Sequence, residues 1–144
     1  MGKFILDPAH AKHAFLAGGI GITPMRSMWK DAFDRKLAVD LSLLYSNRSP
    51  EDIIFRDDLE AMAAGGKGYK VVFSLDTVLR CPTNWKGRCG YIDAPMIRQE
   101  IPDYNERIFY ICGPILMVKK MVEILKVELG VAAENIRQES ISGY

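Results

Sequence analysis

The sequence predicts an α/β fold, a three-layer sandwich in which a five-stranded parallel sheet lies between two layers of helices. Short apolar runs typical of buried strands alternate along the chain with segments whose apolar residues recur at helical spacing. Repetition of strand and helix in this order is typical of parallel sheets, whose crossover connections are helices. The chain has 144 residues, which is the size of one such domain.

The first half of the chain supplies three strands and two helices. The apolar run 14–18 ends in glycines and predicts a buried strand. Thr23 and Pro24 then mark a helix start, a hydroxyl N-cap followed by proline at the first helical position, and helical spacing continues to Phe33. The same criteria predict a strand at 39–45, a helix at 55–64 and a strand at 69–75.

The second half begins with a segment that has no periodicity. Residues 76–91 contain prolines and glycines and predict a long loop, and long loops in compact domains are commonly functional. Asp93 is suited to cap a short helix that runs to about Glu100. The remaining elements are a strand at 107–112, a helix that starts at Gly113 and Pro114 and ends at Gly130, and a strand at 136–139.

Charge balance and apolar run lengths exclude several classes of protein. The 19 basic and 18 acidic residues leave a formal net charge of +1, which argues against a nucleic-acid or anionic-membrane partner. No apolar run approaches the roughly 18 residues of a membrane span, and the first residues lack the pattern of a secretory signal. The three cysteines have no CxxC spacing, which disfavours a zinc ribbon. We therefore expect a cytoplasmic protein without a membrane span.

The two histidines, His10 and His13, lie close together near the start of the chain. Two histidines at this spacing can bind one metal ion, but Asp7 is the only further ligand nearby in the sequence. We expect both side chains to be solvent-exposed and no metal to bind.

Two strand–helix junctions carry the first chemical signal, because ligands of parallel sheets bind beyond the carboxyl ends of the strands. Gly18, Gly19 and Gly21 follow the first strand, where glycines allow close approach and a helix N-terminus attracts phosphate. The loop is not a Walker A motif, and Pro24 stands where a GxGxxG fingerprint has its third glycine. Cys112–Pro114 occupies the equivalent junction after the fourth strand. Taken singly, both junctions also fit a structural turn and a core cysteine.

Three segments stand in order along the chain: GGIGITPM (18–25), YSNRSPEDIIFRDDLE (45–60) and YICGPILMVKKM (110–121). Together they resemble the C-terminal, pyridine-nucleotide-binding half of the ferredoxin–NADP reductase superfamily. WKGRCGYID (85–93) resembles the family's Trp-Gly segment, and residues 2–4 resemble the last strand of the preceding flavin domain. The resemblance covers nearly the whole chain and implies a Rossmann-like NAD(P)-binding module with strand order 3-2-1-4-5.

The resemblance implies roles for the residues of the two junctions. The glycine-loop residues that would line the pyrophosphate and the nicotinamide end of the nucleotide are Gly18, Gly19, Gly21, Thr23 and Pro24. Cys112 would lie near the nicotinamide C4, from which hydride leaves, and would orient and polarise rather than form a covalent intermediate. Gly113 and Pro114 would let the chain pass close to the nucleotide, and Met117 would pack nearby.

Ser46, Asn47 and Arg48 follow the second strand and, by the same resemblance, would face the adenosine ribose. This position distinguishes NAD from NADP, because an arginine there can pair with a 2′-phosphate. No acidic residue stands among them to bind a free 2′-hydroxyl, although Glu51 or Asp52 could do so if the loop turns. A solvated loop arginine is the alternative for Arg48. We expect NAD or NADP, with a slight preference for NADP.

The family's flavin-binding barrel, with its Arg-x-Tyr-Ser/Thr motif, has no counterpart in this sequence. The resemblance therefore implies that residues 1–8 are the end of a linker from a flavin domain and that residues 9–144 are the NAD(P)-binding domain. The intact enzyme would pass hydride from NAD(P)H to FAD, bound mainly by a separate domain or subunit, and then electrons to an iron–sulfur carrier. Tyr144 resembles the C-terminal aromatic residue that stacks on the flavin, unless the natural protein continues beyond it.

Two other functions stay open. A stand-alone module could bind or sense a nucleotide without catalysis. A hydrolase on a similar sheet is disfavoured, since the chain has no Gly-x-Ser-x-Gly motif and its histidines precede the first strand.

Overall fold

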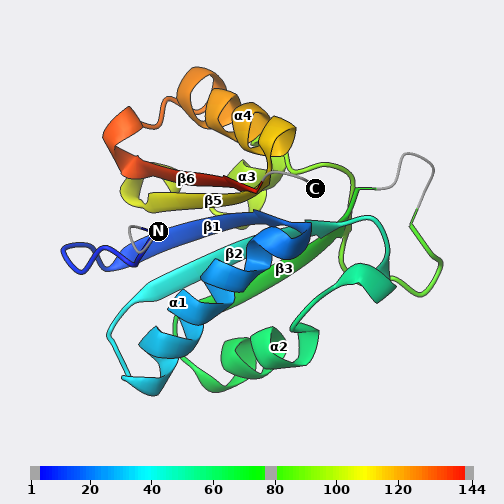
Figure 1. Ribbon diagram of the computed structural model, residues 1–144, viewed down its shortest axis with the longest axis horizontal. Coiled ribbons are helices and arrows are strands. Elements are labelled where there is room, and N and C mark those ends of the chain that lie inside the picture. The colour runs from blue at the N-terminus through cyan, green and yellow to red at the C-terminus, as the bar shows by residue number, and fades with distance from the viewer. Residues whose placement is uncertain (1–3, 77–80, 142–144) are drawn as a thin grey trace.

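The computed structural model describes residues 4–76 and 81–141 and consists of one six-stranded sheet with helices on both faces (Figure 1). All neighbouring strands are parallel, in the order β4-β3-β2-β1-β5-β6. The strands are Lys12–Gly18 (β1), Asp40–Asn47 (β2), Tyr69–Leu75 (β3), Arg88–Cys89 (β4), Ile108–Pro114 (β5) and Ile136–Ile141 (β6). The helices are Ile22–Asp34 (α1), Arg56–Gly65 (α2), Ala94–Glu100 (α3) and Ile115–Glu123 (α4), which continues as a π-helix over Ile124–Glu128.

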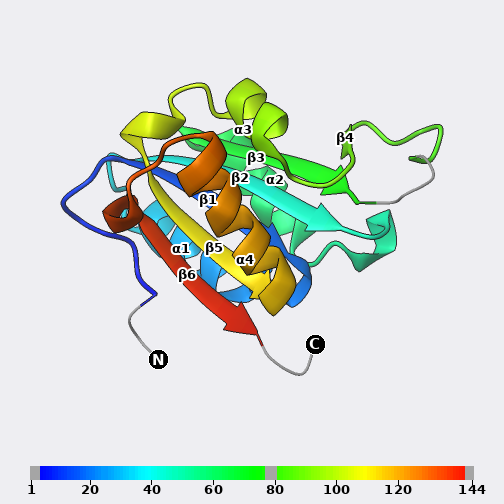
Figure 2. The same ribbon diagram turned by 90° about the horizontal axis from the view of Figure 1, so that it is seen from above.

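Helices α1 and α2 cover one face of the sheet and α3 and α4 the other (Figures 1 and 2). Successive residues of a strand point to opposite faces of the sheet, so the side chains of β1 belong alternately to two hydrophobic cores, one on each face. Phe15 packs edge-on against Trp29 of α1 in one core, with ring centroids 6.3 Å apart. Leu16 belongs to the other core, together with Leu125 beneath α4. The predicted three-layer α/β architecture is confirmed.

The predicted number of five strands is wrong, because a sixth strand lies within the segment expected to be a loop. Arg88 and Cys89 form β4, which pairs with Ser74 and Leu75 at the edge of the sheet. Two residues are too few for any periodicity, so no pattern in the sequence indicates this strand. The five predicted strands follow one another in the sheet as β3-β2-β1-β5-β6.

The starts of two helices also differ from the prediction. A 3₁₀ turn over Gly19–Gly21 leads directly into α1, whose N-cap is Gly21, so the predicted N-cap role of Thr23 is wrong. Gly113 and Pro114 belong to β5 because pairing with β6 continues to the Pro114–Ile141 position, and α4 begins only at Ile115.

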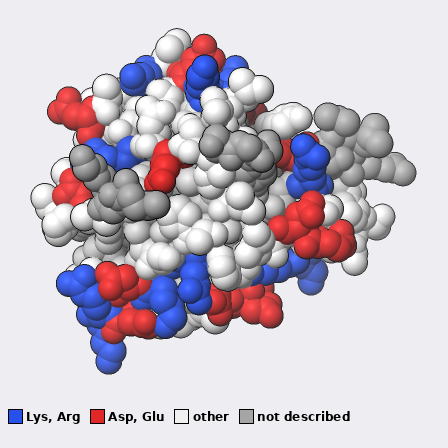
Figure 3. Space-filling view, in the orientation of Figure 1, with Lys and Arg blue, Asp and Glu red and all other residues white. Residues whose placement is uncertain are grey.

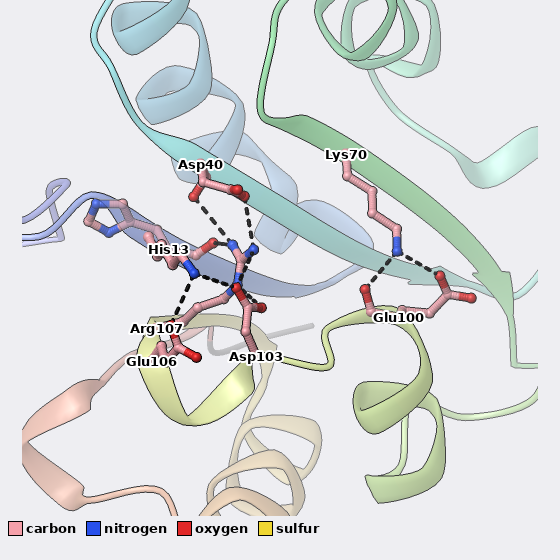
Figure 4. Close-up of polar contacts among 8 residues, drawn as sticks. His13, Asp40, Lys70, Glu100, Asp103, Glu106 and Arg107 are labelled. Atoms are coloured by element: carbon pink, nitrogen blue, oxygen red, sulfur yellow. Dashed lines mark hydrogen bonds and ion pairs between the residues drawn. The ribbon is translucent and has the colours of Figure 1, made fainter.

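At the amino ends of the strands, buried polar groups are joined in a network (Figure 4). The Arg107 guanidinium donates to the carboxylates of Asp40 and Asp103 at 2.9 and 2.7 Å. It also donates to the carbonyl oxygen of His13 at 2.7 Å. His13 itself is fully buried, so the expectation of a solvent-exposed side chain is wrong. The reason is a partner distant in sequence, since His13 Nδ1 lies 3.0 Å from the Tyr110 hydroxyl.

Charged side chains of both signs are interspersed on the face drawn in Figure 3, among the residues described. The net charge of +1 therefore does not arise from two opposed charged regions on this face. Among the described residues, no helix is long and apolar enough to cross a membrane.

Candidate functional site

The carboxyl ends of β1 and β5 bring the two predicted junctions into contact. Ala17 pairs with Cys112 in the sheet, so the glycine loop and the Cys112–Pro114 segment lie side by side at the carboxyl ends of two adjacent strands. A Cβ atom at Gly21 would overlap the carbonyl oxygen of Cys112, and one at Gly18 would overlap the sulfur of Met117. Glycine is thus required at position 21, where the glycine loop packs directly against the backbone of Cys112.

Both helices that begin at these junctions start without a side-chain cap. The N-caps of α1 and α4 are Gly21 and Pro114, and neither makes a side-chain hydrogen bond to the first turn. Gly19 takes the left-handed conformation with φ of 56°, which glycine adopts without strain. Thr23 is exposed in the first turn of α1, with Pro24 half-buried beside it. The two N-termini therefore offer partial positive charge to an anion above the carboxyl ends of the strands.

The hydroxyl of Tyr45, near the end of β2, ties the glycine loop to the next loop of the site. It donates to the carbonyl oxygen of Gly19 at 2.9 Å and accepts from the amide of Ile54 at 3.3 Å. The sequence prediction missed this residue. The available signal was a tyrosine in an otherwise apolar strand, because a buried hydroxyl needs a partner.

Cys112 is fully buried between the two junctions. Burial, together with the charge of Glu139 on β6, raises the pKa of its thiol to about 11. Glu139 is the β6 residue paired with Cys112 in the sheet. The side chain is therefore a neutral thiol at neutral pH, which fits an orienting role and does not fit a nucleophile, since the thiolate is the nucleophilic form.

Ser46, Asn47 and Arg48 lie at the carboxyl end of β2, beside the glycine loop. Gly18 pairs with Ser46 in the sheet, so the two groups of predicted residues adjoin. The Ser46 hydroxyl donates to Asp76 at 3.3 Å. The side-chain nitrogen of Asn47 is buried without a hydrogen-bond partner among the described residues.

Arg48 lines a cavity of about 590 Å³ beyond the ends of β2 and β3. Arg56 forms part of its wall, with its guanidinium stacked on the rings of Phe73 and Trp85 at 5.5 and 5.4 Å from their centroids. The other lining residues are Ser49, Pro50, Glu51, Leu75, Pro82, Asn84 and Lys86. Arg56 and Lys86 are basic residues of this cavity that the sequence prediction did not assign.

A larger cavity, of about 680 Å³, lies at the opposite edge of the sheet and contains none of the predicted site residues. Its walls come from the C-terminal ends of α1 and α2, near Leu37 and Gly66, and from the starts of the strands. Helix C-termini carry partial negative charge and repel phosphate. The carboxyl ends of the strands are therefore the candidate site. Tyr144, which the sequence placed there, lies outside the described residues.

Comparisons with known proteins agree with this geometry. Residues 15–123 match the family model of the oxidoreductase NAD-binding domain. The chain is 36% identical to ferredoxin–NADP reductase B of Sorangium cellulosum over 145 residues, covering 96% of this chain and 58% of that protein. It is 35% identical to NADH-cytochrome b5 reductase 1 of Pyricularia oryzae over 132 residues, covering 86% of this chain and 42% of that protein.

A solved structure supports the same assignment. The cytochrome b5 reductase domain of Ulva prolifera nitrate reductase superposes with a TM-score of 0.80 at 27% identity, covering 90% of this chain and 49% of that one. The chain thus spans about half the length of the proteins that it matches. It belongs to the oxidoreductase NAD-binding domain family and is the NAD-binding domain of a member of the ferredoxin–NADP reductase superfamily.

Proposed function

We propose that this chain binds NAD(P)H across the carboxyl ends of its strands and supplies the nicotinamide side of the hydride-transfer site of a flavin-dependent reductase. The observation that carries the proposal is the contact between the glycine loop that follows β1 and the Cys112–Pro114 segment at the carboxyl end of β5. Both segments lead into helices without side-chain caps, and helix N-termini attract phosphate groups.

The dinucleotide would extend from the β1–β5 junctions to the cavity beside β2. The nicotinamide would lie against Cys112 and Gly113, and Met117, whose sulfur packs against Gly18 and Gly113, would complete that surface. The adenosine would enter the cavity of about 590 Å³ that Arg48 lines, where the stacked Arg56 and Trp85 offer a planar surface. A neutral Cys112 thiol would orient the nicotinamide without reacting with it.

NADP is the proposed nucleotide, because the adenosine cavity is rich in basic side chains. Arg48, Arg56 and Lys86 all line it, and arginine binds phosphate oxygens in a planar, bidentate way. Glu51 also lines the cavity and would favour the free 2′-hydroxyl of NAD. The names of the two relatives divide in the same way, one with NADP and the other with NADH.

The whole enzyme would be an NAD(P)H reductase whose FAD is bound mainly by another domain or subunit. FAD, when bound, accepts a hydride and releases electrons one at a time to a carrier such as an iron–sulfur protein. The surface next to the nicotinamide position fits an apolar partner: Ile115 and Leu116, in the first turn of α4, are 44% and 80% exposed. Exposed apolar residues beside a functional site are typical of an interface.

The ends of the chain fit the same proposal. Residues 1–8 would join a flavin domain to the NAD(P)-binding domain of residues 9–144. Tyr144 would stack on the flavin, and β6 runs toward that position, since its last residues pair with Gly113 and Pro114. We place the enzyme in the cytoplasm, where NAD(P)H is abundant.

Calorimetric titration of the chain with NADPH, NADH and 2′,5′-ADP tests the proposal. We expect Arg48→Ala to weaken NADPH and 2′,5′-ADP binding about tenfold, the effect of losing one charge-assisted phosphate contact, and to spare NADH. Arg35→Ala, which removes an exposed arginine at the far end of α1, is the matched control. Equal losses for NADPH and NADH would remove Arg48 from 2′-phosphate recognition. Binding without flavin reduction, in the presence of the flavin domain, would favour a non-catalytic sensor.

A further inference from the structure

A disulfide closes a loop that supplies part of the wall of the proposed adenosine cavity. Cys81 and Cys89 are bonded, with their Cα atoms 5.9 Å apart and a sequence separation of eight residues. The loop that they close carries Pro82, Asn84, Trp85 and Lys86, all of which line the cavity. The sequence prediction assigned these cysteines no role and noted only that no cysteine pair has CxxC spacing, which disfavours a zinc ribbon.

The two ends of this loop, which we call the Cys81 arm (residues 81–84) and the Cys89 arm (residues 88–90), are attached to the rest of the protein differently. The Cys89 arm is part of the sheet, since Cys89 pairs with Leu75 and the amide of Gly90 donates to the Leu75 carbonyl at 2.8 Å. Arg88 fixes the same arm to α3 through hydrogen bonds to Glu100 and Gln99 at 2.9 and 2.8 Å. Cys89 is thus a rigid anchor, even though its side chain is at the surface.

Among the described residues, the Cys81 arm has weaker attachments to the rest of the protein. The Trp85 amide donates to the Pro82 carbonyl within the loop at 3.0 Å, and the Cys81 sulfur lies 3.9 Å from the Arg88 carbonyl oxygen. The disulfide is therefore the covalent link that holds this arm against the anchored one. Trp85 is held from both sides, by its Nε1 hydrogen bond to the Arg88 carbonyl at 2.8 Å and by the Arg56 guanidinium.

We infer that Cys81–Cys89 is a reversible redox modification site that sets the affinity of the cavity for the adenosine half of the nucleotide. The inference rests on the proposed function. A dithiol reductant transfers two electrons and two protons to the cystine; the sulfur–sulfur bond breaks, two thiols form, and the reductant becomes a disulfide. Cys89 is exposed, which makes the bond accessible to that attack.

Reduction would release the Cys81 arm while the sheet and the Cys89 arm stay in place. Trp85 and Lys86 would then occupy their wall positions for a smaller fraction of the time, and the nucleotide would have to restore the order on binding. Apparent affinity falls in proportion to the fraction of molecules in the competent state. Disulfides are uncommon in reducing compartments, where those present are usually redox-sensing, so a cytoplasmic enzyme with this bond fits such a role.

The experiment compares the oxidised and the dithiothreitol-reduced chain by calorimetry with 2′,5′-ADP and NADPH. We expect reduction to raise both dissociation constants roughly fivefold to tenfold, as expected if the competent fraction falls to between a fifth and a tenth. Thiol titration of the denatured protein reports the state: one thiol, from Cys112, when oxidised, and all three cysteines when reduced. Acrylamide quenching should increase on reduction through Trp85, since Trp29 is fully buried.

The double variant Cys81→Ser/Cys89→Ser is the matched control. It should bind like the reduced chain and should not respond to dithiothreitol, and circular dichroism tests whether it is folded. If the oxidised and reduced chains bind equally, the redox inference is wrong and the proposed function stands. The same holds if the protein prepared without reductant has three free thiols. If neither state binds a dinucleotide, the proposed function is wrong and the inference falls with it.

Discussion

At the amino ends of the strands charged groups bind one another, whereas at the carboxyl ends a buried side-chain donor, on Asn47, has no partner among the described residues. Arg107 is only 6% exposed, and the carboxylates of Asp40 and Asp103 accept its hydrogen bonds (Figure 4). Burial alone would raise the pKa of Asp103, but hydrogen bonds from Arg107 and Lys12 outweigh it and hold that pKa below its ordinary value. The hydroxyl of Tyr69, buried without a partner among the described residues, departs from this pattern.

The carboxyl ends of the strands have the opposite character. Asn47 leaves a buried donor without a partner among the described residues, and α1 and α4 begin without side-chain caps. Buried polar groups are usually satisfied, because an unmet donor costs about 1–3 kcal/mol. The difference between the two ends of the strands fits the proposed function, in which the carboxyl ends bind the nucleotide and the amino ends contribute to stability.

The largest expected effect is on the stability of the fold, from a substitution at the amino ends of the strands. Arg107→Ala removes a buried cation from two carboxylates and from the carbonyl of His13, and we expect a loss of about 3 kcal/mol in the free energy of unfolding, measured in urea. Dinucleotide affinity of the folded variant should not change. The control is Arg35→Ala, whose partner Asp31 and own side chain are both about 60% exposed, and it should cost no more than about 0.5 kcal/mol. Comparable losses in both variants would refute the proposed role of the network.

The next effect is at the carboxyl ends of the strands and should alter both stability and binding. A Cβ at Gly21 would overlap the backbone of Cys112, which cannot move aside as a flexible side chain does. We expect Gly21→Ala to cost about 2 kcal/mol of stability, as overpacking does, and to weaken NADPH binding by at least about tenfold. The control is Gly65→Ala, where the nearest atom is a ring carbon of Phe33 at 3.7 Å. Unchanged NADPH affinity in Gly21→Ala would separate this loop from the nucleotide site.

The main strands and helices could be predicted because each is long enough to show a hydrophobic periodicity or a continuous apolar run. β4 could not, since its two residues are defined by pairing with β3 and by the contacts of Arg88 with α3. The N-cap of α1 was assigned to Thr23 because a hydroxyl before proline is a strong local signal. In the structure the 3₁₀ turn over Gly19–Gly21 starts the helix earlier.

The predicted glycine junctions lie where the sequence placed them, since the absence of a side chain is itself visible in a sequence. The other features depend on contacts between residues far apart. Arg56 reaches the cavity by stacking on Trp85, and His13 is buried against Tyr110. Neither contact follows from local pattern, and the pairing of Cys81 with Cys89 lies in a segment without periodicity.

A smaller effect is expected from Cys112→Ala in the whole reductase. The side chain is buried and neutral, so its loss should change orientation more than binding. We expect single-turnover hydride transfer to slow about tenfold, or about 1.4 kcal/mol in the barrier, with a smaller change in the dissociation constant of NADPH. The rate with native Cys112 should not titrate through this thiol between pH 6 and 8, since its pKa is about 11. An unchanged single-turnover rate would exclude Cys112 from the hydride-transfer site.

The smallest expected effect concerns the amino ends of the strands and appears only in mildly acidic solution. The carbonyl of His10 can only accept, so His13 Nε2, 2.8 Å away, carries the hydrogen and Nδ1 accepts from the Tyr110 hydroxyl. That hydroxyl already accepts from the amide of Asp7 at 2.8 Å. Protonation of His13 would place a hydrogen on Nδ1, so that the Tyr110 hydroxyl would face a second donor. Burial is the main cause that lowers the pKa of His13 below its ordinary value of 6.5.

Because the unfolded chain binds this proton more readily than the folded chain, the contribution of His13 to stability is complete above about pH 6.5 and declines as the pH falls through the folded-state pKa. Urea unfolding at intervals from pH 7 to pH 5 measures that slope. We expect His13→Gln to flatten it and His10→Gln, at an exposed position, to leave it in place. Arg48→Ala, at the carboxyl ends of the strands, should keep the same slope while losing NADPH affinity. A slope that His13→Gln does not change would mean that another group titrates in this range and would exclude His13 as the source of the pH dependence.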